Sequence, residues 1–192
     1  SIAMCIIPII VTIVIVLLAL FVTAIYFPKL EKYVQIICMI PYTIQGVILS
    51  VSILSLYVGS SSILSNRLFM LMGAYCIVIL PYIYQGIRNG MRAVNMPTLI
   101  EAAEMLGASK IYAFFRVVVP NILSAIIVSS LLAVGIIFGD YVLIRNLAGT
   151  SAPNMQIFLY QTMKSDSTKA SAVFVVIMFV TFVITAIVLF MK

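Results

Sequence analysis

The most regular feature of the chain is an alternation of long apolar runs with short polar segments. A helix of about 20 apolar residues spans the ~30 Å hydrocarbon layer of a membrane. Because no water is present there to satisfy the backbone, such runs form helices. The pattern predicts an all-α integral membrane protein of one domain, residues 1–192, with five membrane-spanning helices. These are residues 2–27, 36–58, 68–87, 117–138 and 171–191.

The connections between the predicted spans differ in charge. If the five spans put alternate connections on opposite sides, one side holds seven Lys and Arg residues and the other holds four. The side with more basic residues is expected to face the cytoplasm. The long connection at residues 88–116 belongs to this side, so we expect a cytoplasmic loop there.

Composition agrees with a membrane location. Of the 192 residues, 65% are hydrophobic and 8% are charged, whereas about 25% are charged in a soluble domain. The net charge of +6 comes from basic residues scattered between apolar runs, with no stripe that could follow a phosphate backbone. The expected partner is therefore the lipid bilayer and not a nucleic acid. With no His, and three Cys inside apolar runs, we expect no metal site and no catalytic residues.

Two hexapeptides in the second and third predicted spans resemble each other. Pro-Tyr-Thr-Ile-Gln-Gly at residues 41–46 parallels Pro-Tyr-Ile-Tyr-Gln-Gly at residues 81–86. Pro kinks a span and Gln is costly against lipid, so one interpretation is a partly polar lining of a pathway. Pro kinks and Gln hydrogen bonds between packed helices are the alternative, and a chance similarity is also open. The lining residues of the first interpretation are Tyr42, Gln45, Tyr82 and Gln85.

The outer end of the fourth predicted span carries a G-x-x-x-G pair and an acid. The pair, Gly135 and Gly139, has a spacing that lets two helices approach closely, so we expect helix packing there. Asp140 follows at the interface, where it either meets a pathway or marks the point at which the helix leaves the membrane. The second interpretation is favoured because charge costs little at the interface. Further on, residues 153–164 predict a short amphipathic helix capped by Ser151.

The loop at residues 88–116 contains signals for two helix starts and one helix end. Thr98 and Glu101 fit a capping box, and Pro97 before them discourages an earlier start. Gly107 suits the left-handed position that ends a helix, and Ser109 can cap a second helix. The segment predicts two short helices joined at a Gly corner on the cytoplasmic face.

Such a corner suits a mechanical contact because both ends of its first helix are fixed. Ala102 and Ala103 are expected to present a low surface that the groove of a partner can approach. Met105 and Leu106 could supply an apolar anchor. The alternative is an amphipathic helix on the membrane surface without a partner, and these features do not exclude it.

The same segment resembles the EAA motif of ABC importer permeases. That motif reads E-A-A, three residues, G, nine residues and I-x-L-P, and its spacing is kept in full here. Two aliphatic positions differ, with Val117 and Val119 in place of Ile and Leu. The matching positions are Glu101, Ala102, Ala103, Gly107, Val117, Val119 and Pro120.

The resemblance implies the five-helix core of a type I ABC importer permease in the plasma (inner) membrane of a prokaryote. Such permeases usually carry a further N-terminal helix, which we expect to be missing here. The implied partners are a second permease, identical or sister, two cytoplasmic ATPase subunits that bind ATP and Mg²⁺, and an extracytoplasmic binding protein. The chain has no GxxxxGK[ST] phosphate loop, so ATP hydrolysis is expected from those subunits.

In this family the corner docks into an ATPase subunit, and Pro120 is expected to set the start of the following span. The implied docking residues are Glu101, Ala102, Ala103, Glu104, Met105, Leu106 and Gly107.

Residues 138–149 and 157–160 are similar to permeases of the polyamine, ferric-iron and phosphonate group, and among these substrates we favour a polyamine. Two other classes of function are kept as alternatives: a secondary transporter, and a membrane scaffold without a pathway. A secondary transporter would use ionisable residues inside its spans. None lies in the middle of a predicted span.

Overall fold

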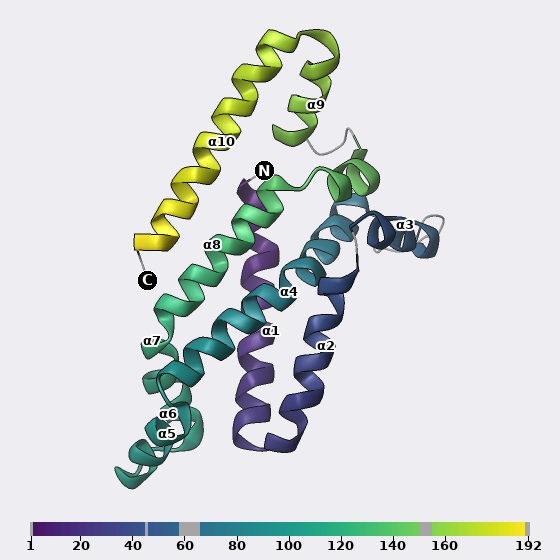
Figure 1. Ribbon diagram of the computed structural model, residues 1–192. Helices are drawn as coiled ribbons and strands as arrows, with labels where there is room; N and C mark the ends of the chain where they lie inside the picture. The colour runs from purple at the N-terminus through teal and green to yellow at the C-terminus, as the bar shows by residue number, and fades with distance from the viewer. Residues whose placement is uncertain (1, 45, 58–65, 150–154, 191–192) are drawn as a thin grey trace.

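The computed structural model describes residues 2–44, 46–57, 66–149 and 155–190, and every regular element in these ranges is helical (Figure 1). The predicted all-α class is confirmed. The longer elements are α1 (Ile2–Ile25), α2 (Glu31–Thr43), α3 (Gly46–Tyr57), α4 (Arg67–Ala93), α5 (Met96–Met105), α8 (Leu123–Gly139), α9 (Met155–Ser165) and α10 (Ser167–Phe190). The shorter ones are η1 (Pro28–Leu30), α6 (Lys110–Ala113), η3 (Phe114–Val118), α7 (Val119–Asn121) and η4 (Ile144–Ala148).

Within the described ranges, two helices are long and apolar enough to cross a membrane without a break. They cover Cys5–Ile25 and Arg67–Ala93. α4 continues to Ala93, past the predicted end at residue 87, so the first part of the predicted loop is helical. α10 likewise begins before residue 171, at Ser167.

The apolar run predicted as one span at residues 36–58 contains a sharp bend. α2 ends at Thr43, and α3 leaves it at an angle of 97°. Ile44 between them has an extended backbone, with φ −88° and ψ 117°, and Pro41 in the last turn of α2 lacks a backbone donor. Hydropathy does not detect this bend because the residues on both sides of it are apolar.

The run predicted as one span at residues 117–138 also contains a bend. The segment Lys110–Asn121 meets α8 at 64°. It contains the π-helical element η3, and Pro120, which has no amide hydrogen, lies just before the bend. α8 begins at Leu123, so Pro120 precedes the following helix and does not start it.

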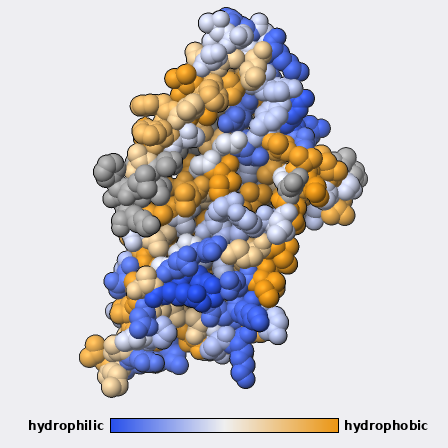
Figure 2. Space-filling model, viewed as in Figure 1, coloured by the Kyte–Doolittle hydropathy of each residue, from blue (hydrophilic) through white to orange (hydrophobic). Residues whose placement is uncertain are grey.

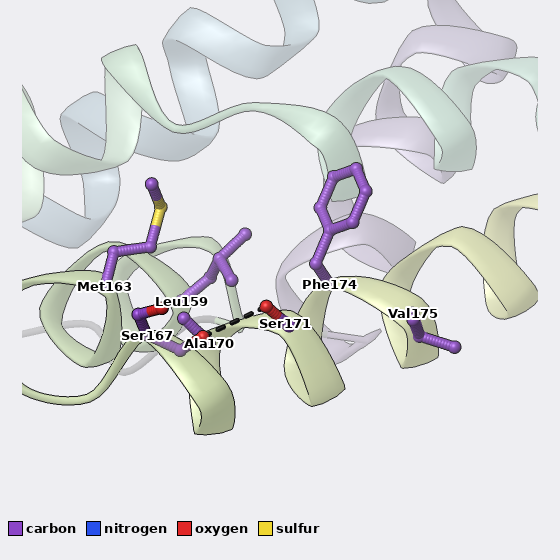
Figure 3. Close-up of a pocket in the computed structure, with 7 residues that line it drawn as sticks. All are labelled: Leu159, Met163, Ser167, Ala170, Ser171, Phe174 and Val175. Carbon is purple, nitrogen blue, oxygen red and sulfur yellow. Dashed lines mark hydrogen bonds between the residues drawn. The ribbon is translucent and has the colours of Figure 1, made fainter.

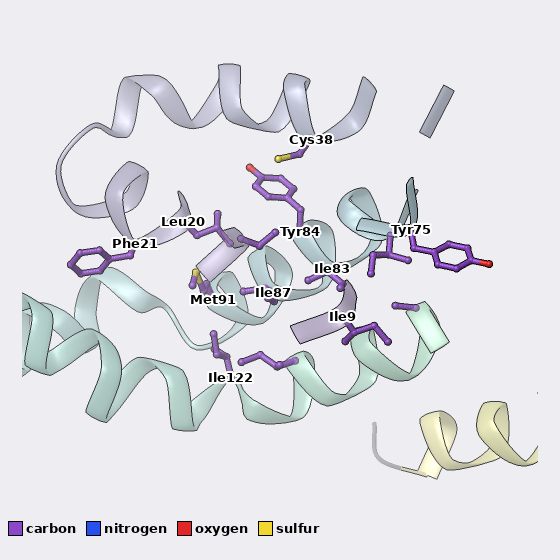
Figure 4. Close-up of a cluster of buried hydrophobic side chains, with 14 of the residues drawn as sticks. Ile9, Leu20, Phe21, Cys38, Tyr75, Ile83, Tyr84, Ile87, Met91 and Ile122 are labelled. Atoms are coloured by element: carbon purple, nitrogen blue, oxygen red, sulfur yellow. The ribbon is translucent and has the colours of Figure 1, made fainter. Parts of the chain in front are cut away.

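α4 is the central helix of the bundle and packs against α1, α2 and α8 (Figure 1). Its inward side chains Ile79, Ile83, Tyr84 and Ile87 are fully buried. Figure 4 shows Tyr84 extending toward Cys38 of α2. The position of α4 therefore depends on three neighbouring helices at once.

α4 and α8 approach each other closely where both carry small residues. A Cβ atom added to Gly86 would lie 2.5 Å from the Cβ of Ser129, and one added to Gly90 would lie 2.5 Å from the Cβ of Ala125. Within each helix the two residues are one turn apart, so one small pair faces another. A side chain at either glycine position would therefore force the two helices to shift.

The other G-x-x-x-G pair makes no such contact. Within the described ranges, no atom of a neighbouring element lies within 4 Å of a Cβ added to Gly135 or Gly139. The packing contact predicted at this pair is therefore wrong for the chain by itself.

α9 and α10 form a hairpin that leans on α8 and stands apart from α2 (Figure 1). A cavity of about 500 Å³ lies along the hairpin and is lined mainly by apolar side chains, Leu159, Met163 and Phe174 among them (Figure 3). The short helix predicted at residues 153–164 is present as α9. Its predicted cap, Ser151, lies outside the described residues.

Candidate functional site

The first helix predicted in the loop at residues 88–116 starts earlier than its sequence predicts. α5 begins at Met96, after Asn95 in the left-handed conformation with φ 49°, and Asn95 makes no side-chain cap. Pro97 lies inside the first turn, where its fixed φ is compatible with a helix and its missing N–H costs nothing. The predicted capping box of Thr98 and Glu101 is therefore wrong, because both residues lie inside the helix.

The end of α5 follows the prediction. Gly107 has φ 84°, and its N–H donates to the carbonyl oxygen of Glu104 at 2.9 Å. The N–H of Ala108 donates to the carbonyl oxygen of Ala103 at 3.0 Å, which completes a Schellman motif. The Ser109 hydroxyl then accepts from the N–H of Tyr112 at 3.3 Å and caps α6. We call residues 101–110 the corner.

The tip of the corner is an exposed apolar surface. Met105 is 90% exposed and Leu106 is 89% exposed. A Cβ added to Gly107 meets no described atom within 4 Å, so the space in front of the turn is open. Beside the tip lies a hollow of about 570 Å³ that Thr98 and Glu101 help to line. The corner thus has both a projecting apolar pair and a hollow next to it.

The opposite face of α5 is buried against the protein. Ala103 is 7% exposed, so the prediction that it presents a surface to a partner is wrong, whereas Ala102 is exposed. α5 packs here against η3, whose Phe114 is fully buried. The ring of Phe114 lies 4.9 Å from that of Phe21 in α1. The corner is therefore fixed to the transmembrane bundle through an aromatic contact.

The aliphatic end of the motif lies in and just after η3. Val117 and Val119 are half-buried, the fully buried residue is Val118 between them, and Pro120 is exposed. These positions pack the base of the corner.

An ion cluster that the sequence analysis did not identify joins α2 to α4. One carboxylate oxygen of Glu31 lies 2.7 Å from Nη2 and 2.9 Å from Nε of Arg88. The same oxygen lies 3.6 Å from Nη2 of Arg92. The Arg88 side chain is only 15% exposed, so this charge pair is partly desolvated. It lies near the start of α5, beside a cavity of about 310 Å³ that Met96 helps to line.

The two resembling hexapeptides meet in space. The rings of Tyr42 and Tyr82 lie 5.8 Å apart, and both side chains are exposed, as is Gln85. Asn89 and Arg92 continue the same face of α4, because the four α4 residues are spaced three, four and three apart. Figure 2 shows hydrophilic surface over the lower half of α4. Gln45 lies outside the described residues.

Asp140 is directed into the protein. The Tyr75 hydroxyl donates to its carboxylate at 3.3 Å, and the N–H of Leu143 donates to it at 3.2 Å. Burial raises the pKa of Asp140, while these hydrogen bonds oppose the rise. Asp140 thus follows the end of α8 and caps the next turn. Among the described residues, no group of three or more His, Cys, Asp or Glu side chains could hold a metal ion.

The comparison with protein families gives one match. A family model described as binding-protein-dependent transport system inner membrane component matches residues 1–192. No curated protein matches the chain significantly.

Proposed function

Because the chain belongs to the family of inner membrane components of binding-protein-dependent transport systems, we propose that it forms half of the solute pathway of an ATP-driven importer. Members of this family are multi-pass, non-catalytic membrane components, and they act with ATPase subunits, a substrate-binding protein and a second permease. The organism proposed is a prokaryote.

We propose that the corner docks into a cytoplasmic ATPase subunit, and the exposed pair Met105 and Leu106 carries this proposal. Each would gain about 1.5–3 kcal/mol on full burial, which is enough for the centre of a protein interface. The backbone hydrogen bonds around Gly107 fix the backbone that carries the pair, so little backbone entropy is lost on docking.

The main alternative for the corner is a helix lying on the membrane without a partner. Helices of that kind carry Lys and Arg on their polar face, which attract anionic lipids. α5 carries Glu101 and Glu104 and has no basic residue. Its charge therefore favours a protein partner over a lipid surface.

The polar face of α4 supports the pathway assignment. Tyr82, Gln85 and Asn89 are exposed on a helix long enough to cross the membrane, and polar groups of this kind are costly against lipid. A water-filled pathway shared with the second permease removes that cost. We propose that these residues and Tyr42 line the cytoplasmic half of the pathway, and that Asp140 does not.

The connection between corner and pathway is short. Only Val94 and Asn95 separate the end of α4 from the start of α5. The Glu31–Arg88 pair holds α2 to the same end of α4. A displacement of the corner by an ATPase subunit would therefore move α4 together with its polar face.

Substitution Gly107→Arg tests the docking. We expect loss of uptake and of transport-coupled ATPase activity, because the side chain would fill the open space in front of the turn. The purified permease should keep its helix content, because the added atoms meet nothing within the described chain and the left-handed backbone at residue 107 costs an L residue only about 1–2 kcal/mol.

The matched control is Gly107→Asn, which keeps the left-handed turn with a short side chain at a cost of roughly 1 kcal/mol or less. It should retain most of the activity. Wild-type uptake and ATPase activity in Gly107→Arg would overturn the docking assignment. Uptake that persists with catalytically inactive ATPase subunits would favour a secondary transporter instead.

A further inference from the structure

A cluster of basic and aromatic side chains lies at the end of the molecule opposite the corner. Arg145 of η4 and Lys164 of α9 lie over the ring of Tyr160, each 4.8 Å from its centroid. Tyr141 packs on Tyr160 with the ring centroids 4.9 Å apart, and its hydroxyl accepts from Nη1 of Arg145. With Gly149 and their neighbours these four residues line a cavity of about 370 Å³. We call the four residues the outer cluster.

A third cation lies beside this cavity. Arg67 begins α4, and its Nη1 atom would be 3.8 Å from a Cβ added to Gly149. The positive charges thus come from three separate elements, α4, η4 and α9. Packing of the outer segment brings Arg67, Arg145 and Lys164 toward one place.

No Asp or Glu in the described part of the chain forms an ion pair with these cations. The sequence contains five acidic residues, and all five are in the described ranges. Asp140 is bound by Tyr75, as described above. Asp166 pairs with Lys169 at 3.3 Å and accepts from the N–H of Thr168 at 3.0 Å. The other three are Glu31, Glu101 and Glu104, at the opposite end of the molecule.

The three cations repel one another, and the aromatic rings reduce this repulsion only in part. A cation over an exposed ring is attracted to its face, but the ring carries no net charge. The positive potential reaches Tyr160, whose pKa is lowered by a hydrogen bond and by charge from Lys164, with a further contribution from Arg145. A bound anion would satisfy Arg145 and Lys164 together, and a guanidinium can hold an oxyanion through two hydrogen bonds.

We propose that the outer cluster binds the oxyanion group of a small soluble solute, a phosphonate, phosphate or carboxylate, as this solute enters the pathway. This proposal rests on the importer function and names its substrate class. A polyamine would be repelled by Arg145 and Lys164 and would find no free carboxylate at this end of the chain. The earlier preference for a polyamine stays a prediction, and the chemistry of the outer cluster opposes it.

The test measures binding of methylphosphonate to the complete transporter, purified with its second permease and ATPase subunits in a non-ionic detergent. The ³¹P linewidth of methylphosphonate reports the bound fraction. Arg145→Gln and Lys164→Gln should each weaken binding about tenfold, as for loss of one charge-assisted hydrogen bond. Spermidine at matched ionic strength should not compete.

The matched control is Lys169→Gln, which removes the same charge from the same outer segment but from a residue paired with Asp166. Its binding of methylphosphonate should equal that of the wild type. Equal binding by Arg145→Gln, or an equal loss in Lys169→Gln, would overturn the site. Competition by spermidine would also overturn it. The same holds if phosphatidylglycerol copurifies tightly with the wild type and is lost only from the Arg145 and Lys164 variants.

The outcomes for the importer and for its substrate class are separable. If ATPase subunits copurify with the wild type but methylphosphonate does not bind, the substrate class is wrong and the importer stands. If no ATPase subunit copurifies, the importer itself is wrong.

Discussion

Two pairs of glycines with the same spacing have opposite environments in this protein. Gly86 and Gly90 are closed by small residues of α8, whereas no described residue approaches a Cβ at Gly135 or Gly139. The motif permits close approach of two helices, but the facing helix decides whether it happens. In α8, Ala125 and Ser129 are small and have the same spacing as Gly86 and Gly90, so the two helices can approach closely there.

The largest effect is expected from Gly90→Leu. Its Cβ would lie 2.5 Å from that of Ala125, and the rest of the side chain would force α4 and α8 apart. We expect a loss of about 3 kcal/mol or more in the free energy of unfolding, measured by thermal unfolding of the detergent-purified protein. Gly73→Leu in the same helix is the control, because no described atom lies within 4 Å of its Cβ. Equal losses of unfolding free energy in Gly90→Leu and Gly73→Leu would contradict the importance of the close helix contact at Gly90.

A smaller effect is expected from Gly86→Ala. The added methyl group lies 2.5 Å from the Cβ of Ser129, and the cost of overpacking is about 1–3 kcal/mol, partly offset by the better helix propensity of Ala. In the double variant with Ser129→Gly the next neighbour is the Cα of residue 129 at 3.7 Å, an ordinary contact. Unfolding measurements should therefore show that the second substitution restores most of the lost stability. If the effects of the two substitutions on the free energy of unfolding simply add, the two residues do not touch.

The smallest effect is expected from Gly135→Leu. No described atom lies within 4 Å of a Cβ added to Gly135, so the free energy of unfolding should change by no more than about 0.5 kcal/mol. Pairing with the second permease can be followed in the same preparation by chemical crosslinking. Lost pairing at unchanged stability would mean that the other subunit closes this glycine pair. A stability loss as large as that of Gly90→Leu would instead remove the distinction between the two pairs.

Features that depend on neighbouring residues were predictable from the sequence. The turn at Gly107 and the cap at Ser109 need only the residues within one helical turn, and both are present as expected. The start of α5 shows the limit of such rules. Thr98 and Glu101 fit a capping box, but Pro97 is also acceptable in a first turn, and the helix begins before it. Two local rules competed there, and the sequence did not show which would prevail.

Features that depend on direction in space were not predictable. Hydropathy marks residues 36–58 and 117–138 as apolar but does not report the bends of 97° and 64° inside these runs. The ion pair of Glu31 with Arg88 joins positions 57 residues apart. Likewise, Arg67, Arg145 and Lys164 are isolated charges in the sequence, and only the packing of α4, η4 and α9 brings them together. Local geometry within one segment was therefore predictable, whereas groupings of side chains from several segments were not.

The close approach of α4 and α8 also determines how the bundle responds to cold. Attraction between apolar helices inside lipid does not come from release of water, because the surrounding acyl chains are equally apolar. It comes from dispersion forces between atoms in contact, which fall steeply with distance and change little with temperature. Cooling weakens the association of apolar surfaces in water, but the junction at Gly86, Gly90, Ala125 and Ser129 does not rely on that effect. The centre of the bundle should therefore stay closed at temperatures where contacts formed in water begin to loosen.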